Sequence, residues 1–132
     1  MAEFIGLMVG DGCLMGNQQT AMLTLAPEEE AVARRVHEAL NTYRNANAAD
    51  ARAARDIEIT RPQETLRIGT SARCVVDLAS SYALLDKGST NKAFKPTVWN
   101  LDKTSTAAML RGLFTADGTV AQYGNKSQHV SL

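Results

Sequence analysis

The sequence predicts an α+β fold in which helices cover one face of an antiparallel sheet. Three observations support this prediction. A stretch near the N-terminus, residues 4–14, occurs again in altered form at residues 110–120. Between the two copies, two regions alternate apolar and polar residues as the strands of a half-buried sheet do, and two others repeat apolar residues at helical spacing. The predicted order is helix, hairpin, helix, hairpin, helix, followed by a second helix and hairpin.

The repeated stretch predicts a pair of closely packed helices. It reads FIGLMVGDGCL at Phe4–Leu14 and LRGLFTADGTV at Leu110–Val120, and the copies share two glycines, a leucine and an aspartate. Small residues four apart lie on one helix face, where they let two backbones approach more closely than bulky side chains would. The small residues of this face are Gly6, Gly10, Gly112 and Ala116.

An Asp-Gly pair ends each of these predicted helices. Glycine just past the last turn tolerates a left-handed conformation, so we expect the chain to leave both helices there. If the helices pack on one another, Asp11 and Asp117 become neighbours. Adjacent carboxylates repel unless they share a proton or a cation, and hard divalent ions such as Mg²⁺ prefer oxygen ligands. The pattern therefore indicates a nuclease-like metal site.

Composition bounds the class of protein. With 132 residues, of which 45% are apolar and 21% charged, the chain has the size and composition of one soluble globular domain. It lacks an apolar run of roughly 18 to 20 residues and a basic leader with an apolar core, so we expect no membrane span and a cytoplasmic location. Cys13 and Cys74 lack the paired spacing of a zinc site, and we expect both to be reduced.

The distribution of charge bears on nucleic-acid binding. The formal net charge is zero, whereas phosphate contacts usually require an excess of Lys and Arg. Residues 1–50 carry three Lys or Arg against seven Asp or Glu, but residues 51–100 carry eight against five. A basic strip in the middle of the chain could therefore follow DNA.

The first motif copy is followed by a predicted hairpin and a predicted helix. Apolar segments at 13–15 and 21–25 flank a polar tip, whose side chains could read base edges or could form a turn that contacts nothing. The tip residues are Asn17, Gln18 and Gln19. Pro27 and the three acids after it begin the helix. Its buried stripe consists of Val32, Val36, Leu40 and Tyr43, and His37 is assigned a structural role because it has no partner at ligand spacing.

A second hairpin with one apolar face follows. Ile57 and Ile59 alternate with polar residues before a turn at 61–63, and Leu66 and Ile68 do so after it. The polar face offers donors for phosphates and guanine edges, although it could also be a solvated outer face. Its residues are Arg55, Thr60, Arg61, Gln63, Thr65 and Arg67.

The remaining elements lead to the second motif copy. A helix capped by Thr70 or Ser71 is predicted to run to about Leu85, and residues 88–100 are predicted to be an irregular connection. Thr104 or Ser105 is expected to cap the second motif helix. The final segment, from Val120, repeats the first hairpin, and its Lys126 is included among the expected DNA contacts.

Each motif copy resembles the LAGLIDADG motif of homing endonucleases, whose nine positions are filled by Phe4–Gly12 and again by Leu110–Gly118. The resemblance implies an αββαββα half over residues 1–100, with an antiparallel sheet that saddles the DNA major groove, and an incomplete second half over residues 101–132. In this family a lysine and proline segment also precedes the second motif helix. Lys92 or Lys95 is therefore expected to assist catalysis, although the family usually has an apolar residue where Lys95 stands.

The resemblance also implies an activity and a context. One phosphodiester per strand of double-stranded DNA would be hydrolysed with Mg²⁺ or Mn²⁺ held by Asp11 and Asp117, and the carbonyls of Gly10 and Ala116 would be further ligands. The second copy resembles the form found in intein endonucleases. No splicing residues are present, so if an intein is the source, we expect this chain to be its inserted nuclease part, with a splicing domain flanking it in the parent protein. With an incomplete second half, it should cleave poorly alone.

Two other functions fit the sequence. The chain could be a catalytically silent DNA- or RNA-binding relative, as maturases and LAGLIDADG-type regulators are, or a plain α+β interaction domain. Retention of both motif aspartates favours the endonuclease over the silent relative, and the duplicated motif favours either of these over the interaction domain.

Overall fold

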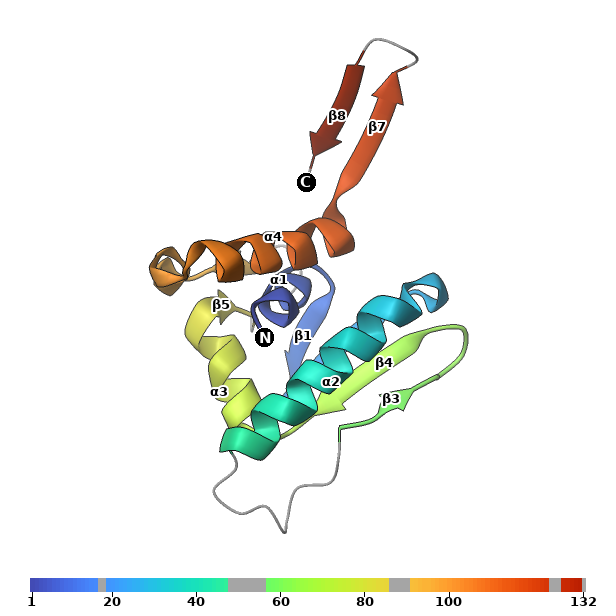
Figure 1. Ribbon diagram of the computed structural model, residues 1–132. Helices are drawn as coiled ribbons and strands as arrows, with labels where there is room; N and C mark the ends of the chain where they lie inside the picture. Colours follow the sequence, from blue (N-terminus) through green and yellow to red (C-terminus); the bar gives the residue numbers. More distant parts are fainter. Residues whose placement is uncertain (17–18, 48–56, 86–90, 124–126, 132) are drawn as a thin grey trace.

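The computed structural model describes residues 1–16, 19–47, 57–85, 91–123 and 127–131, and it confirms an α+β fold (Figure 1). Four helices alternate with antiparallel strands in the predicted order. The helices are α1 (Ala2–Gly10), α2 (Glu30–Asn47), α3 (Arg73–Tyr82) and α4 (Lys103–Asp117), with 3-10 turns η1 (Pro27–Glu29) and η3 (Pro96–Asn100). No helix in this described part of the chain is long and apolar enough to cross a membrane.

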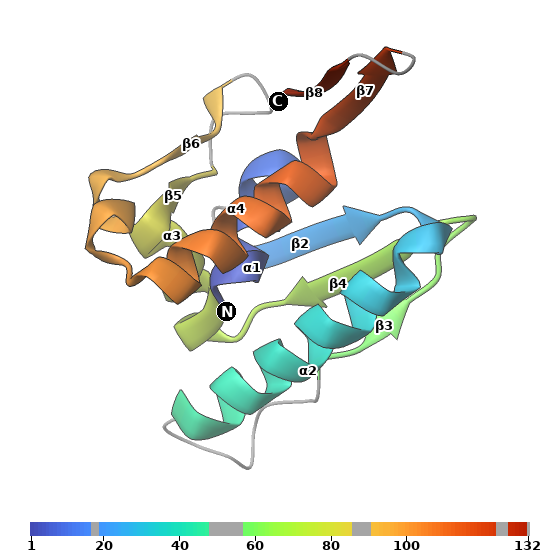
Figure 2. The same ribbon diagram turned by 45° about the horizontal axis from the view of Figure 1, so that its top comes forward.

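A four-stranded antiparallel sheet with the strand order β1-β2-β4-β3 forms one layer. Its strands are β1 (Gly12–Met15), β2 (Thr20–Leu25), β3 (Ile59–Thr60) and β4 (Leu66–Thr70). In the register, Leu23 lies opposite Gly12 on one side and Ile68 on the other. Both predicted hairpins are confirmed. They pair with each other through β2 and β4, so β3, which precedes β4 in the chain, lies at the edge of the sheet. The helices lie on one face of the sheet (Figure 2), and the apolar residues that alternate along its strands belong to the buried core.

Helix α1 lies at the centre of the molecule, between the sheet and α4 (Figures 1 and 2). Phe4, Leu7 and Met8 are at most 2% exposed. A helix that is apolar on all sides requires cover on all sides, and α1 is buried from Glu3 to Met8. The core that surrounds it also contains the predicted stripe residues Val36 and Leu40 of α2.

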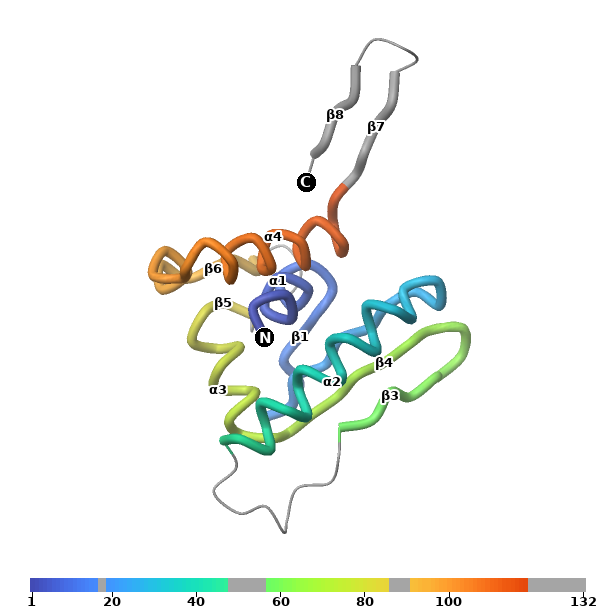
Figure 3. Tube along the Cα trace, in the orientation of Figure 1, coloured from blue at the N-terminus to red at the C-terminus, as the bar shows by residue number. Residues whose placement is uncertain are grey.

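Helices α1 and α4 lie side by side (Figure 3), and their backbones are in contact at Gly6 and Gly112. A methyl group on Gly6 would lie 1.9 Å from the Met109 carbonyl oxygen, and one on Gly112 would lie 2.1 Å from the Glu3 carbonyl oxygen. In each case the carbonyl belongs to the residue three positions before the partner glycine. The contact is therefore reciprocal, as expected if the two motif copies are related by a local two-fold axis.

A buried carboxylate joins three helices beside this contact. Glu3, which is 7% exposed, accepts hydrogen bonds from Arg35 of α2 at 2.7 and 3.0 Å and from Arg111 of α4 at 3.2 Å. The two guanidinium groups outweigh the effect of burial and lower the pKa of Glu3 from 4.5 to about 2. The sequence pattern did not predict this ion cluster.

Several local features differ from the sequence prediction. Helix α3 ends at Tyr82, and the chain continues as β5 (Ala83–Leu84), which pairs with β6 (Ala93–Phe94) where an irregular connection was predicted. The N-cap of α4 is Asp102, whose carboxylate accepts from the Ser105 amide at 3.0 Å, rather than Thr104 or Ser105. A carboxylate at the N-cap accepts a hydrogen bond from a backbone amide as readily as a hydroxyl does, so Asp102 takes the capping role.

Two smaller predictions concern capping and His37. No side chain caps α3 at its N-cap residue, but the Thr70 hydroxyl accepts from the Ala72 amide at 3.1 Å just before the helix. His37 has the structural role expected of it, because its Nε2 atom lies 2.6 Å from the carbonyl oxygen of Ile57 and so ties α2 to the start of the second hairpin.

The chain ends in a hairpin, as the repeat predicts. Strands β7 (Thr119–Tyr123) and β8 (Ser127–Ser131) are antiparallel, with Ala121 opposite His129. Backbone pairing thus follows both copies of the motif.

We expect Gly6→Ala and Gly112→Ala each to lower the free energy of unfolding by at least about 3 kcal/mol, because the added methyl group meets backbone atoms that cannot rotate away. Urea unfolding measures this. The loss in the double variant should be smaller than the sum of the two single losses, because one substitution already separates the helices. Gly69→Ala is the matched control, because its methyl group would meet only the flexible end of Met22 at 3.3 Å. Equal losses at all three glycines would contradict this account.

Glu3→Gln should cost about 2 kcal/mol at pH 7, less than for a fully buried ion pair, because Arg35 and Arg111 are half exposed. The stabilisation by Glu3 is complete above the pKa of the unfolded chain, 4.5, and is lost as the pH falls towards about 2. The difference between wild type and variant in urea unfolding should therefore shrink across that interval. Glu28→Gln, which removes an exposed carboxylate, is the control.

Candidate metal centre and nucleic-acid surface

The two motif helices end side by side. Asp11 follows the last residue of α1, and Asp117 is the last residue of α4. A methyl group on Gly10 would lie 2.3 Å from Ala116 Cβ and 3.3 Å from Asp117 Oδ2. The small residues Gly10 and Ala116 therefore permit the approach predicted for them, and they bring the carboxylate of one copy over the backbone of the other.

The glycines after the aspartates have a different role from the one predicted. Neither Gly12 nor Gly118 has a positive φ, and Gly118 is extended. Methyl groups there would lie 2.5 Å from Met8 Cα and 2.3 Å from the Phe114 carbonyl oxygen, each four residues earlier. Glycine is thus required because the chain turns back against the last turn of its own helix. This tight exit holds each aspartate at the helix end.

The electrostatics of Asp11 are those of a carboxylate among other acids. Burial raises its pKa, and the charges of Asp117 and Glu29 raise it further, while Lys92 acts in the opposite direction. Glu29 was not predicted to lie near the motif. Its carboxylate accepts from the Ala26 amide at 2.8 Å, which fixes it at the start of η1. The charges of Asp117 and Glu29 therefore both act on Asp11 at this end of α1.

The two lysines proposed as catalytic helpers have different contacts in the structure. The Lys92 ammonium donates to the carbonyl of Gly10 and, at 3.1 Å, to that of Gly12. The Lys95 ammonium donates to the carbonyl of Ser80, near the end of α3. Lys92 therefore contacts the motif directly, whereas Lys95 supports the neighbouring helix.

Four oxygen donors at the helix ends are the candidate ligands for a magnesium ion that would share its coordination sphere with a substrate. The oxygen donors are the carboxylates of Asp11 and Asp117 and the carbonyls of Gly10 and Ala116, which lie where helix carbonyls lack intrahelical donors. Among the residues that the structure describes, no group of three or more His, Cys, Asp or Glu side chains could hold a metal. Mg²⁺ commonly uses only one or two carboxylates together with phosphate oxygens and water.

The sheet presents its second face to the surface. Thr24, Arg67 and Thr60 form one row across β2, β4 and β3, and the Thr60 hydroxyl donates to the Arg67 carbonyl at 3.3 Å. Arg67 and Thr60 are exposed, as predicted. Beside this row, Cys13, Met22 and Gly69 form an uncharged row. The face therefore offers one positive charge among small and flexible side chains.

The other residues expected to contact DNA are placed differently. Arg61 binds Glu30 of α2 at 2.9 Å, and this contact lowers the pKa of the Glu30 carboxyl. Its charge is therefore compensated on the helix side of the sheet. Gln19 is exposed beside the first turn, and Gln63 and Thr65 lie in the second turn, where Thr65 donates to the Pro62 carbonyl. Asn17, Gln18, Arg55 and Lys126 lie outside the described residues.

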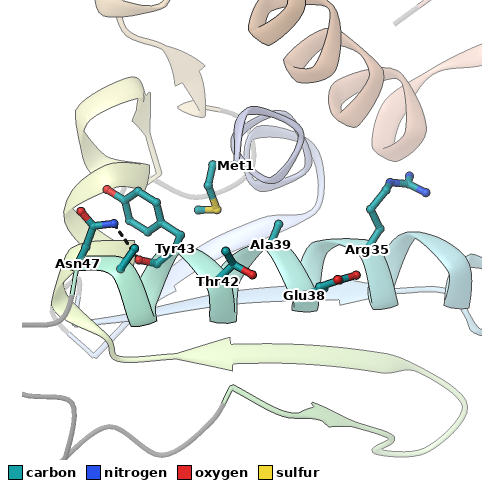
Figure 4. A pocket seen from close by; sticks show the side chains of 8 residues that line it. Met1, Arg35, Glu38, Ala39, Thr42, Tyr43 and Asn47 are labelled. Atoms are coloured by element: carbon teal, nitrogen blue, oxygen red, sulfur yellow. Dashed lines mark hydrogen bonds between the residues drawn. The ribbon is translucent and has the colours of Figure 1, made fainter.

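A groove of about 540 Å³ lies at the opposite end of α1 from the aspartates. It runs along α2 and is closed at one side by Met1 (Figure 4). Tyr43 and Asn47 line its far end, where the Asn47 amide donates to the Tyr43 carbonyl at 2.8 Å. The motif aspartates are not among the described residues that line this groove, so it is separate from the candidate metal centre.

Comparison with known protein families, with curated proteins and with solved structures found no match to this chain.

We expect Asp117→Asn to lower the pKa of Asp11 and Lys92→Met to raise it, because the first removes a like charge and the second an opposite one. Carboxyl ¹³C chemical shifts followed across pH report this directly. Since a raised pKa in the folded state disfavours the ionised form, Asp117→Asn should also stabilise the metal-free protein above the pKa of Asp11. If the pKa of Asp11 is the same in both variants as in the wild type, these groups are not coupled.

Proposed function

We propose that the protein is a metal-dependent, site-specific DNA endonuclease of the LAGLIDADG kind. The observation that carries this proposal is the reciprocal contact of α1 and α4, which brings two equivalent aspartates to one place. A plain interaction domain has no need for two carboxylates that raise each other's energy. Perturbed carboxyl groups at a junction of elements are more common at catalytic sites than elsewhere.

The outer side of α4 supports the same proposal. Leu110 and Phe114 occupy the repeat positions of Phe4 and Met8, which α1 buries against the sheet. In α4 these side chains are 41% and 38% exposed. Helix α4 thus carries the apolar pattern of a helix that a sheet covers. This pattern is expected for a second half built like the first.

The chemistry assigned to the site is phosphodiester hydrolysis. Asp11 and Asp117 would hold Mg²⁺ or Mn²⁺, with the Gly10 and Ala116 carbonyls as further donors, and the ion would supply an activated water and stabilise the leaving oxygen. The pair of glycine contacts fixes both carboxylates on rigid helix ends, so little reorganisation is needed when the phosphate arrives. The sheet face with Arg67 would contact the DNA and position the scissile bond.

We expect Arg67→Ala to weaken binding to a preferred duplex by about 1 to 3 kcal/mol, because this side chain is exposed on the face proposed to contact DNA. Fluorescence anisotropy with a duplex selected from a random pool measures this, at two salt concentrations so that loss of a phosphate contact is visible as a smaller salt slope. Arg61→Ala should have a smaller effect, because Glu30 already binds its guanidinium. Arg34→Ala, which removes an exposed charge from α2, is the control. Equal losses for all three would indicate unspecific charge effects.

We expect little cleavage from the 132 residues alone, because α4 lacks a covering sheet in the described part of the chain. We expect strong Mg²⁺-dependent double-strand cleavage once a full second half follows Gly118. Placing a repeat of residues 13–100 after Gly118 uses the chain's own sheet for this purpose. Asp11→Asn or Asp117→Asn should then reduce single-turnover cleavage at least about a hundredfold while leaving DNA affinity within about twofold, because the loss affects transition-state stabilisation.

Two results would change the assignment. If the completed chain binds a specific duplex but never cleaves it with any divalent ion, the protein is a catalytically silent binding relative. If the 132-residue chain already cleaves a specific site, a second sheet is not required for activity.

A further inference from the structure

We propose that Lys92 and the divalent ion compete for the carbonyl of Gly10, so that Lys92 is an internal cation that holds the end of α1 in the metal-free protein and is released when the ion binds. The inference depends on the proposed metal centre and concerns how that centre is loaded.

The contacts of Lys92 support this. Its ammonium donates to the carbonyls of Gly10 and Gly12, on both sides of Asp11, so that one of the four candidate metal donors, the Gly10 carbonyl, is already bound to a cation. The Gly10 carbonyl belongs to the last residue of α1 and so lies at the negative end of the helix dipole, which favours a positive charge. The position that the ammonium occupies is therefore attractive to any cation, including a metal ion.

Simultaneous occupancy is unfavourable for electrostatic reasons. The Gly10 carbonyl has two lone pairs and could accept two partners sterically. An ammonium and a divalent ion on the same oxygen would, however, be separated by only a few ångströms and would repel strongly. Binding of the ion should therefore displace the ammonium. By linkage, the contact between Lys92 and Gly10 must weaken metal binding by the same factor by which the bound metal weakens that contact.

Lys95 provides a matched comparison within the same segment. It has the same charge, lies three residues later and also donates to a backbone carbonyl, that of Ser80. Substitution of Lys95 removes one positive charge without changing the end of α1. A general effect of net charge on metal affinity would therefore appear in both lysine variants, whereas competition would appear only at Lys92.

The first measurement is Mn²⁺ binding to the 132-residue chain, followed by the loss of the free-ion electron paramagnetic resonance signal. We expect Lys92→Met to bind Mn²⁺ about fivefold more tightly than wild type, or more, while Lys95→Met stays within about twofold. Lys92→Arg, which retains the charge, should resemble wild type. Thermal unfolding without metal confirms that each variant is folded, and saturating Mn²⁺ should raise the unfolding temperature of Lys92→Met more than that of wild type.

The second measurement uses unmodified protein and so does not depend on the folding of a variant. Brief acetylation with and without saturating Mg²⁺, read by mass spectrometry, reports how accessible each lysine amine is. Release by the ion should raise the acetylation rate of Lys92 several-fold and leave those of Lys95 and Lys103 unchanged.

The outcomes separate this inference from the proposed function. Mn²⁺ binding that is lost in Asp11→Asn and Asp117→Asn but is equal in wild type and Lys92→Met, with no change in acetylation, overturns the competition and leaves the metal centre intact. Weaker binding in Lys92→Met also overturns it, because Lys92 would then help to hold the ion. Absence of Mn²⁺ binding in wild type and in every lysine variant overturns both proposals.

Discussion

The contact between the α1 and α4 backbones at Gly6 and Gly112 is the constraint on which the rest of the structure depends. Each glycine lies against a carbonyl of the other helix, and no side chain fits between them. At this separation the ends of the helices cannot diverge, so Asp11 and Asp117 are held together at one end and Glu3 meets Arg111 at the other. Carboxylate repulsion at the first end and ionic attraction at the second thus act across the same interface.

This arrangement explains why an unfavourable charge pair can persist. The raised pKa of Asp11 means that its ionised form is less stable in the folded protein than in the unfolded chain. The buried core around Leu7 and the Glu3 ion cluster stabilise the helices that carry the charges. A rigid scaffold that keeps like charges together is a common property of sites that bind cations, and here Lys92 partly compensates the repulsion.

Much of the fold was predictable because its signals are local or repeated. Alternation at Leu66 and Ile68 and helical spacing at Val36 and Leu40 specify which face is buried. The repeat predicts that the aspartates lie close together, because a duplicated small-residue face implies that the copies pack on each other. Glu3, Arg35 and Arg111 were missed because they meet across 32 and 108 residues of chain, which no periodicity records. For the same reason, the sequence could not distinguish Lys92 from Lys95.

The positions where the two copies differ show how a symmetric frame can support an asymmetric site. Asp11 lies just beyond α1, whereas Asp117 is still the last residue of α4, so the equivalent carboxylates leave their helices in different ways. Only the first has a lysine on the carbonyls beside it within the described residues. Glu29 adds its charge to Asp11. The two motif carboxylates therefore have unequal surroundings, so in the proposed endonuclease they would act unequally on the two strands of an asymmetric duplex.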